Sequence, residues 1–258
     1  MLRLVTLNFW GTHEPFRARM ELAKRQLAAL KPDVLCLQEV SRVGESTTAH
    51  ELADFLGMNC VTSNELAVLA RDPIGEHTVT PLPEPRPDDA RFLLSARVDT
   101  AAGDVWCHSA HLHYRLDDGV AREKQVVAID DVVSSIDSER PQLLCGDFNS
   151  TPDHDEIRFL RGLTTLAGRR THYQDAFMRI HPDAKGLTWS AENEQTRAWR
   201  SLDIDRRIDF VFVTSRAKDG RGSVHDARVV LDERDGDGHC ASDHYGVLAD
   251  VQISPSAA

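Results

Sequence analysis

Residues 142–150, with the sequence QLLCGDFNS, constrain the fold of this chain more than any other stretch. The apolar run ends at a glycine and is too short for a helix, so it predicts a buried strand. Gly146 allows a sharp turn, after which Asp147 and Asn149 share one side while Phe148 faces the other. A carboxylate and an amide at one point suit a cation that prefers oxygen ligands, or an attacking water. By composition alone, a simple turn would be the favoured interpretation.

The length and composition indicate an ordinary globular protein. The 258 residues, 41% of them hydrophobic and 28% charged, are enough to bury a substantial core. Four prolines between residues 81 and 87 predict a loop and not a linker, because strand-like sequence resumes at Phe92. We find no repeat and no segment long and apolar enough to span a membrane, and Met1–Leu4 enters the fold without a leader sequence. We therefore expect one domain, residues 1–258, and a monomer.

The charge and the cysteines bear on partners and compartment. A net charge of -11 and a pI near 5.5 argue against broad electrostatic binding of polyanions. Phosphate binding depends on the local potential, so this charge still allows a locally basic cleft, although no long basic groove is evident in the sequence. The five cysteines are scattered, odd in number and without metal-ligand spacing, which indicates reduced thiols and a cytoplasmic location.

Polar side chains collect where the predicted strands end. Helical spacing predicts helices at 17–30, 47–55, 122–136 and 155–160, and apolar or alternating runs predict strands at 2–8, 33–39, 65–70, 91–98, 105–113 and 207–213, with a last strand after His244. Asp209 lies inside one of these strands, where a carboxylate is unfavourable unless it is paired or coordinates a metal. His111 and His113 share one face of their strand. At any single position, a solvated carboxylate or a structural histidine is an ordinary alternative.

Eight polar residues at or near element boundaries form the candidate site: Asn8, Glu39, His111, Asp147, Asn149, Asp209, Asp243 and His244. Six short pieces carry them along the chain: TLN (6–8), LQE (37–39), AHL (110–112), GDFN (146–149), RIDF (207–210) and SDH (242–244). Each piece alone is weak, but six in this order are specific. On these residues the sequence resembles the endonuclease/exonuclease/phosphatase superfamily, which has the fold of pancreatic-type deoxyribonuclease and apurinic-site endonucleases.

The resemblance implies a four-layer α/β sandwich, in which two packed mixed β-sheets are flanked by helices. It also implies hydrolysis of a phosphoester with a divalent metal, Mg²⁺ or Mn²⁺ in its place, bound in a cleft at one end. By similarity, Glu39 would be the principal metal ligand, and Asn8 and Asp243 would complete an oxygen-rich environment.

The resemblance also implies roles for the catalytic groups. His244 would act as the base or as a phosphate-stabilising group, oriented by Asp209 through a carboxylate–imidazole hydrogen bond. Asp147 and Asn149 would position the attacking water and a phosphate oxygen. His111 would act as a general acid or a phosphate clamp, and a histidine here resembles the deoxyribonuclease-like and sphingomyelinase-like branch of the superfamily.

Residues around this set would choose the substrate. In deoxyribonuclease-like members a glutamate pairs with the histidine, and Glu65 occupies a similar place here, although a solvated strand start is an equal alternative. Loops at 13–17, 114–118 and 186–206 would lie at the metal end. The predicted substrate-binding residues are His113, Arg115, Trp189, Asn193 and Arg207, and the last loop also contains Arg197, Trp199, Arg200 and Arg206.

The predicted function is divalent-metal-dependent hydrolysis of a phosphodiester or phosphomonoester. A small phosphoester or a nucleotide fits the acidic chain somewhat better than a nucleic acid, and a DNA or RNA nuclease of the same fold is the alternative. A catalytically silent binding module would have lost at least one of the chemical groups, and none is missing.

Overall fold

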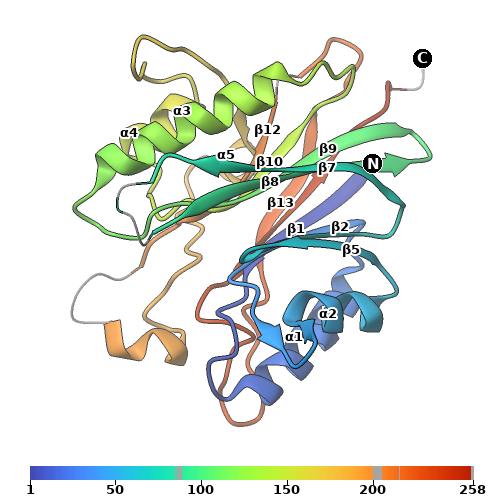
Figure 1. The fold of residues 1–258 in the computed structure, drawn as a ribbon, viewed down its shortest axis with the longest axis vertical. Coiled ribbons are helices and arrows are strands. Elements are labelled where there is room, and N and C mark those ends of the chain that lie inside the picture. The colour runs from blue at the N-terminus through green and yellow to red at the C-terminus, as the bar shows by residue number, and fades with distance from the viewer. Residues whose placement is uncertain (85, 87–88, 200–204, 215, 257–258) are drawn as a thin grey trace.

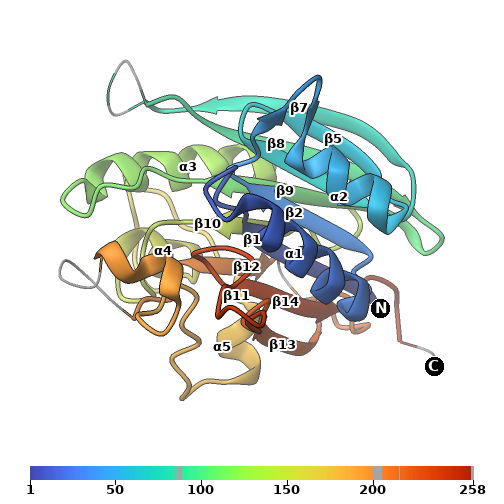
Figure 2. The same ribbon diagram turned by 90° about the horizontal axis from the view of Figure 1, so that it is seen from below.

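The computed structural model describes residues 1–84, 86, 89–199, 205–214 and 216–256. Two mixed β-sheets pack face to face, and helices cover the outer side of each sheet (Figure 1, Figure 2). This arrangement confirms the predicted four-layer α/β sandwich.

Each sheet has six strands within the described residues. The first sheet has the order β13 (Val224–Val230), β14 (Gly246–Val251), β1 (Leu2–Asn8), β2 (Val34–Gln38), β6 (Leu66–Ala70) and β5 (Asn59–Ser63). The second sheet has the order β11 (Gln174–Asp175), β12 (Asp209–Val213), β10 (Leu143–Asp147), β9 (Gly103–His111), β8 (Arg91–Thr100) and β7 (Ile74–Leu82). A short ribbon of β3 (Arg42–Val43) and β4 (Ser46–Thr47) follows β2.

The helices divide between the two outer faces. The first sheet is covered by α1 (Phe16–Leu30) and α2 (Thr48–Leu56), and the second by α3 (Gly119–Ser135) and α4 (Asp155–Leu160) (Figure 1). Met20, Ala23 and Leu27 of α1 are buried against the sheet, as their helical spacing predicts. A short helix, α5 (Ala176–Ile180), packs beside β12 and β13, and a 3-10 helix, η1 (Glu194–Trp199), precedes β12.

Two parallel strand pairs bring the polar strand ends to one edge of the sandwich. β1 and β2 run parallel and are connected through α1, while β9 and β10 run parallel and are connected through α3. Asn8 is level with Gln38, the residue before Glu39, and Asp147 is level with both His111 and Asp209. The strand register therefore explains why residues far apart in the sequence meet.

The main core lies between the two sheets. It is built from apolar side chains that are almost fully buried, including Leu4, Val68, Leu94, Leu143 and Val211. Burial of a side chain of this size contributes about 1.5–3 kcal/mol. The core therefore fixes how the sheets face each other and, with that, how the strand ends of one sheet lie against those of the other.

Gly146 has a role different from the predicted turn. It lies inside β10 with φ of +141°, and a Cβ there would be 1.9 Å from the carbonyl oxygen of Ala110 on β9. The glycine thus permits a close approach of two parallel strands, and the chain turns only later, at Asn149, where φ is +50°. Phe148 faces the other side as predicted and packs in the apolar cluster beneath α3 and α4, with its ring centroid 5.3 Å from that of Phe212.

Edge strands account for the main differences from the sequence prediction. β7 continues through Pro81 to Leu82, inside the stretch predicted as a loop. A proline is tolerated there because β7 is an edge strand, in which backbone N–H groups on the outer side have no hydrogen-bond partner in the sheet. The sequence does not predict β5, β7 or β13, because all three are edge strands whose polar or exposed residues interrupt the apolar pattern.

The structure also bears on membranes and thiols. Within the described part of the chain, none of the helices is both long and apolar enough to cross a bilayer. The five cysteines form no disulfide, and Cys36, Cys107 and Cys145 pack in the core between the sheets. These thiols behave as small hydrophobic side chains.

Candidate active site

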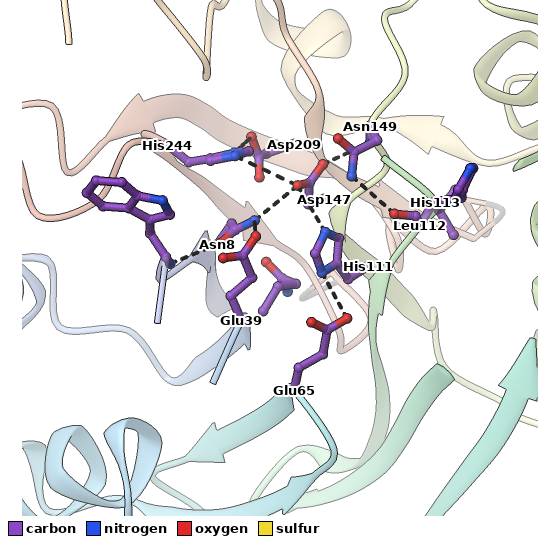
Figure 3. Close-up of polar contacts among 12 residues, drawn as sticks. Asn8, Glu39, Glu65, His111, Leu112, His113, Asp147, Asn149, Asp209 and His244 are labelled. Atoms are coloured by element: carbon purple, nitrogen blue, oxygen red, sulfur yellow. Dashed lines mark hydrogen bonds and ion pairs between the residues drawn. The ribbon is translucent and has the colours of Figure 1, made fainter. Parts of the chain in front are cut away.

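Asp147, at the end of β10, lies at the centre of the polar cluster (Figure 3). Its Oδ2 accepts a hydrogen bond of 3.1 Å from Asn8 Nδ2, and it lies 3.5 Å from His111 Nε2 and 3.8 Å from His244 Nε2. The side chain is almost fully buried. The carboxylate therefore faces nitrogen atoms contributed by both sheets, and it can orient a polar molecule placed among them.

His244 and Asp209 form a buried pair. His244 Nδ1 lies 2.9 Å from Asp209 Oδ2, and Asp209 is fully buried in β12. Burial alone would lower the pKa of His244, but the carboxylates of Asp209, Asp243 and Asp147 raise it well above its usual value. The acidic surroundings therefore favour the protonated form of the imidazole. A cation at this position can stabilise negative charge on a phosphate.

Glu39 and Asp243 provide a second pair of carboxylates, on the other side of Asn8. Glu39 follows β2 with φ of +54°, an unfavourable conformation for a glutamate, and its Oε1 accepts a 3.0 Å hydrogen bond from Asn8 Nδ2. Asp243 Oδ1 lies 3.2 Å from Ser242 Oγ. Burial and the negative charge of Glu39 raise the pKa of Asp243 to about 6.

The donor set of Glu39 and Asp243 fits a hard divalent cation. Both offer carboxylate oxygens, which such ions prefer, and their mutual repulsion is relieved when a cation binds beside them. Arg19 is the buried cation nearby, but its N–H groups bond to backbone carbonyls and not to these carboxylates. Asn8 turns its amide nitrogen toward the carboxylates, because its Oδ1 accepts a 3.0 Å hydrogen bond from Trp10 N.

A second group of candidate ligands overlaps the buried pair. One ligand atom each of Asp147, Asp209 and His244 lie within 4.8 Å of one another. In this group His244 Nδ1 already bonds to Asp209 Oδ2, at 2.9 Å. Imidazole is also a less suitable ligand than carboxylate for magnesium-like ions. We therefore favour Glu39 and Asp243 as the metal end of the site.

His111 is held by Glu65 and by an arginine that the sequence does not indicate. His111 Nδ1 lies 3.0 Å from Glu65 Oε1, which is the pairing that the resemblance implies. Arg91, the first residue of β8, donates to the same carboxylate at 3.0 Å and to Asp89 Oδ1 at 2.9 Å. Burial alone would lower the pKa of His111, but the charge of Glu65 raises it. Only the pairing of β8 with β9 brings Arg91 here, so no sequence signal could have found it.

Asn149 lies beside Asp147 at the end of β10. Its backbone N–H donates to Asp147 Oδ1 at 2.8 Å, and its Nδ2 donates to the carbonyl oxygen of Leu112 at 3.1 Å. These bonds hold a left-handed backbone conformation that asparagine adopts more readily than most residues. The amide and the carboxylate therefore lie together at the strand end.

A largely apolar pocket of about 260 Å³ adjoins His244 and Asn149. Its other lining residues are Tyr114, Leu116, Trp189, Trp199, Arg206 and Ile208. Tyr114, Leu116 and Trp199 are large and apolar, yet about half of each side chain is exposed. Exposed apolar side chains that gather in one place mark a binding surface. Aromatic rings here can stack on a planar group next to a phosphate held at the polar cluster.

Comparison with known proteins gives the family. A model of the endonuclease/exonuclease/phosphatase family matches residues 5–244. This chain belongs to that family. Membership confirms the resemblance seen in the sequence and makes the protein a metal-dependent phosphoesterase or nuclease. No curated protein sequence matches the chain.

Solved structures of family members share the fold. D. rerio TDP2, in complex with a single-strand DNA product, is 18% identical with a TM-score of 0.78, over 96% of this chain and 97% of that chain. Truncated Caenorhabditis elegans TDP2 is 19% identical with a TM-score of 0.75, over 96% of each chain. An endonuclease/exonuclease/phosphatase from Beutenbergia cavernae is 23% identical with a TM-score of 0.70, over 98% of this chain and 72% of that chain.

The predicted substrate-binding residues of this family member have different surroundings. Trp189 lines the apolar pocket. The Nδ2 of Asn193 donates to the carbonyl oxygens of Ser242 and Asp243 at 2.8 and 3.1 Å, so it supports the loop that carries Asp243. Arg207 does not bond to the polar cluster; its Nη2 forms a buried ion pair with Asp175 Oδ2, at 2.8 Å. Asn193 and Arg207 are thus occupied inside the protein.

Two predicted substrate-binding residues, His113 and Arg115, follow the end of β9. His113 is buried and bonded to Asp89. Arg115 is half-buried, and its guanidinium lies 5.7 Å from the ring centroid of Tyr114, on the loop that lines the pocket. Arg200 lies outside the described residues.

Proposed function

We propose that this phosphoesterase hydrolyses the phosphodiester of a nucleotide or of a single-stranded nucleic-acid end, with Mg²⁺ as its metal. One observation carries the proposal. Asp147 lies among nitrogen atoms of Asn8, His111 and His244, directly beside a pocket lined by aromatic rings. A phosphate at the polar cluster would therefore have room for a nucleobase at its side. The complex of D. rerio TDP2 with a single-strand DNA product supports this choice of substrate.

In this proposal the charged side chains divide the work of the reaction. Asp147 and Asn149 orient the attacking water and a phosphate oxygen. His244, kept protonated by Asp209, donates from Nε2 to a phosphate oxygen and stabilises the charge that develops there. His111, held by Glu65, clamps the phosphate or gives a proton to the leaving oxygen.

The metal is proposed to bind at Glu39, with Asp243 and the amide of Asn8 beside it. Two carboxylates with few imidazoles suit Mg²⁺, and Mn²⁺ can take its place. When bound, a divalent cation polarises the P–O bonds and neutralises charge on the leaving oxygen. The surrounding protein keeps Glu39 in position, because Asn8 bonds to both Glu39 and Asp147.

Substrate contacts outside the polar cluster are proposed for the rim of the pocket. Trp189 and Trp199 would stack on a base, and Arg115 would pair with a phosphate. The cytoplasm is the proposed location, because all five cysteines are free thiols. The protein is proposed to act as a monomer.

The test is hydrolysis of a chromogenic bis-phosphodiester and of labelled single-stranded DNA, each measured with Mg²⁺, Mn²⁺ and chelator. We expect Glu39→Gln and His244→Ala to lose at least about a hundredfold in kcat/KM on both substrates while remaining folded. Matched controls are Glu76→Gln and His225→Ala, whose side chains are exposed away from the site. Full activity in chelator, or in either site variant, would overturn the assignment.

A further inference from the structure

Two adjoining hollows form a groove at the end of the second sheet that lies away from the candidate active site. Their volumes are about 450 and 600 Å³, and they share His172, Tyr173 and Arg216. Gln142 and Thr214 line the first hollow, immediately before β10 and immediately after β12. At about 3.3 Å per residue, β10 separates this groove from the catalytic strand end by roughly 13 Å.

Basic side chains line this groove, which runs against the overall charge of the chain. They come from separate parts of the sequence, and the lining also includes the acidic residues Glu139 and Asp175: the basic residues are Arg140, Arg161, His172, Arg179, Arg216 and Arg221. The chain as a whole has 41 acidic and 30 basic residues. Residues 157–182 reverse this balance, with five arginines, two histidines and one acidic residue, Asp175. These basic segments lie apart along the chain, so the sequence alone predicts no long basic groove.

Several of these guanidinium groups have no acidic partner. Arg161, Arg179 and Arg216 contact no carboxylate within the residues that the structure describes. The carboxylate of Asp175 is taken by Arg207, in a buried ion pair of 2.8 Å. Unpaired guanidinium groups around a hollow give it a positive local potential, whatever the net charge of the protein.

We propose that this groove binds the phosphate backbone of a single nucleic-acid strand. Guanidinium groups match phosphate geometry with two parallel hydrogen bonds, and arginines in both hollows would contact successive phosphates. Leu163 and Met178 offer apolar surface to sugars and bases. The recessed shape favours a strand over a flat lipid surface.

The proposal goes beyond the hydrolysis reaction, because binding in this groove requires no chemistry. A strand held here would lie outside the polar cluster around Asp147 and would add affinity for a long substrate. It would not change the reactivity of a small phosphodiester. The two activities can therefore be measured separately.

The test uses fluorescence anisotropy of a labelled single-stranded 20-mer DNA in chelator, with the full chain. The triple variant Arg161→Gln/Arg179→Gln/Arg216→Gln should bind at least tenfold more weakly, with a shallower dependence of log Kd on log salt. The matched control is Arg25→Gln/Arg71→Gln/Arg228→Gln, whose arginines lie around the first sheet. It should bind as the unaltered protein does.

Hydrolysis of the chromogenic diester separates this inference from the proposed function. Unchanged rates in the triple variant, together with weaker DNA binding, would support a separate groove. Equal DNA binding by the triple variant and the unaltered protein would overturn the proposal. So would binding to phosphatidylserine vesicles or to pyrophosphate without binding to DNA. An unaltered protein that binds DNA but leaves the diester intact would contradict the proposed function alone.

Discussion

Arg19 illustrates how one buried residue can organise a site that it does not enter. Its guanidinium is fully buried and donates to five backbone carbonyl oxygens, those of Phe9, Trp10, Gly11, His13 and Ala241. Burial lowers its pKa to about 10, and the charges of Asp243 and Glu39 oppose that shift. The side chain therefore ties the loop after Asn8 to the loop before Ser242.

Replacement of Arg19 by lysine tests this positioning role. Lysine has only three donors, so at least two buried carbonyls lose their partner, which costs about 1–3 kcal/mol each. We expect Arg19→Lys to lower the free energy of unfolding and, in the folded protein, to raise the Mg²⁺ concentration needed for half-maximal activity. Urea denaturation and metal titration measure the two effects. Arg25→Lys, an exposed position in the same helix, is the control and should change neither.

The charge on His244 gives a second prediction at this scale. The carboxylate of Asp209 keeps the pKa of His244 raised, so in Asp209→Asn the pKa must fall. If protonated His244 is the active form, activity is lost as the pH rises through that pKa. The alkaline limb of kcat/KM should therefore move to lower pH in Asp209→Asn, by about one unit or more. A limb that stays in place would show that His244 is not the titrating group.

At the scale of elements, the sequence predicts where the buried strands end, but it does not predict the edge strands. An apolar run that stops at a polar residue marks both a buried strand and its end, which is why Glu39 and Asp147 could be predicted. Edge strands such as β7 and β13 have one exposed face and no such pattern. Arg91 acts beside His111 through strand pairing, and pairing partners are not encoded locally.

His108 on β9 ties the stability of the second sheet to pH. It is fully buried, with Nδ1 2.7 Å from Ser95 Oγ and Nε2 3.0 Å from Gln142 Oε1. Burial lowers its pKa from 6.5 to about 4. The unfolded chain therefore binds a proton between pH 6.5 and about 4 that the folded protein excludes.

Stability should consequently fall on acidification across this window, by about 3 kcal/mol from this histidine alone. The measurement is the free energy of unfolding in urea at pH 7 and pH 4.5, compared with that of His108→Gln. The variant is less stable at pH 7 but should lose less on acidification. His225→Gln, at an exposed position, should follow the unaltered protein. Parallel losses in all three proteins would exclude His108 as the cause.

At the scale of the whole molecule, four carboxylates that repel one another lie where the two sheets meet. Glu39 and Asp243 come from the first sheet, Asp147 and Asp209 from the second, and the interdigitated core between them prevents the carboxylates from moving apart. A cation bound only by the folded state must then stabilise the entire sandwich, because mass action favours whatever state binds it. The thermal midpoint should rise with Mg²⁺ concentration.

The pH dependence of that metal effect gives the last prediction. The pKa of Asp243 is about 6, so protons compete with the metal below that pH. The rise in thermal midpoint caused by Mg²⁺ should therefore be large at pH 8 and should shrink as the pH falls through about 6. In Glu39→Gln the rise should be small at both values, whereas Glu76→Gln should match the unaltered protein. A metal effect that grows on acidification would mean that the cation binds elsewhere, since proton competition can only oppose binding to a carboxylate.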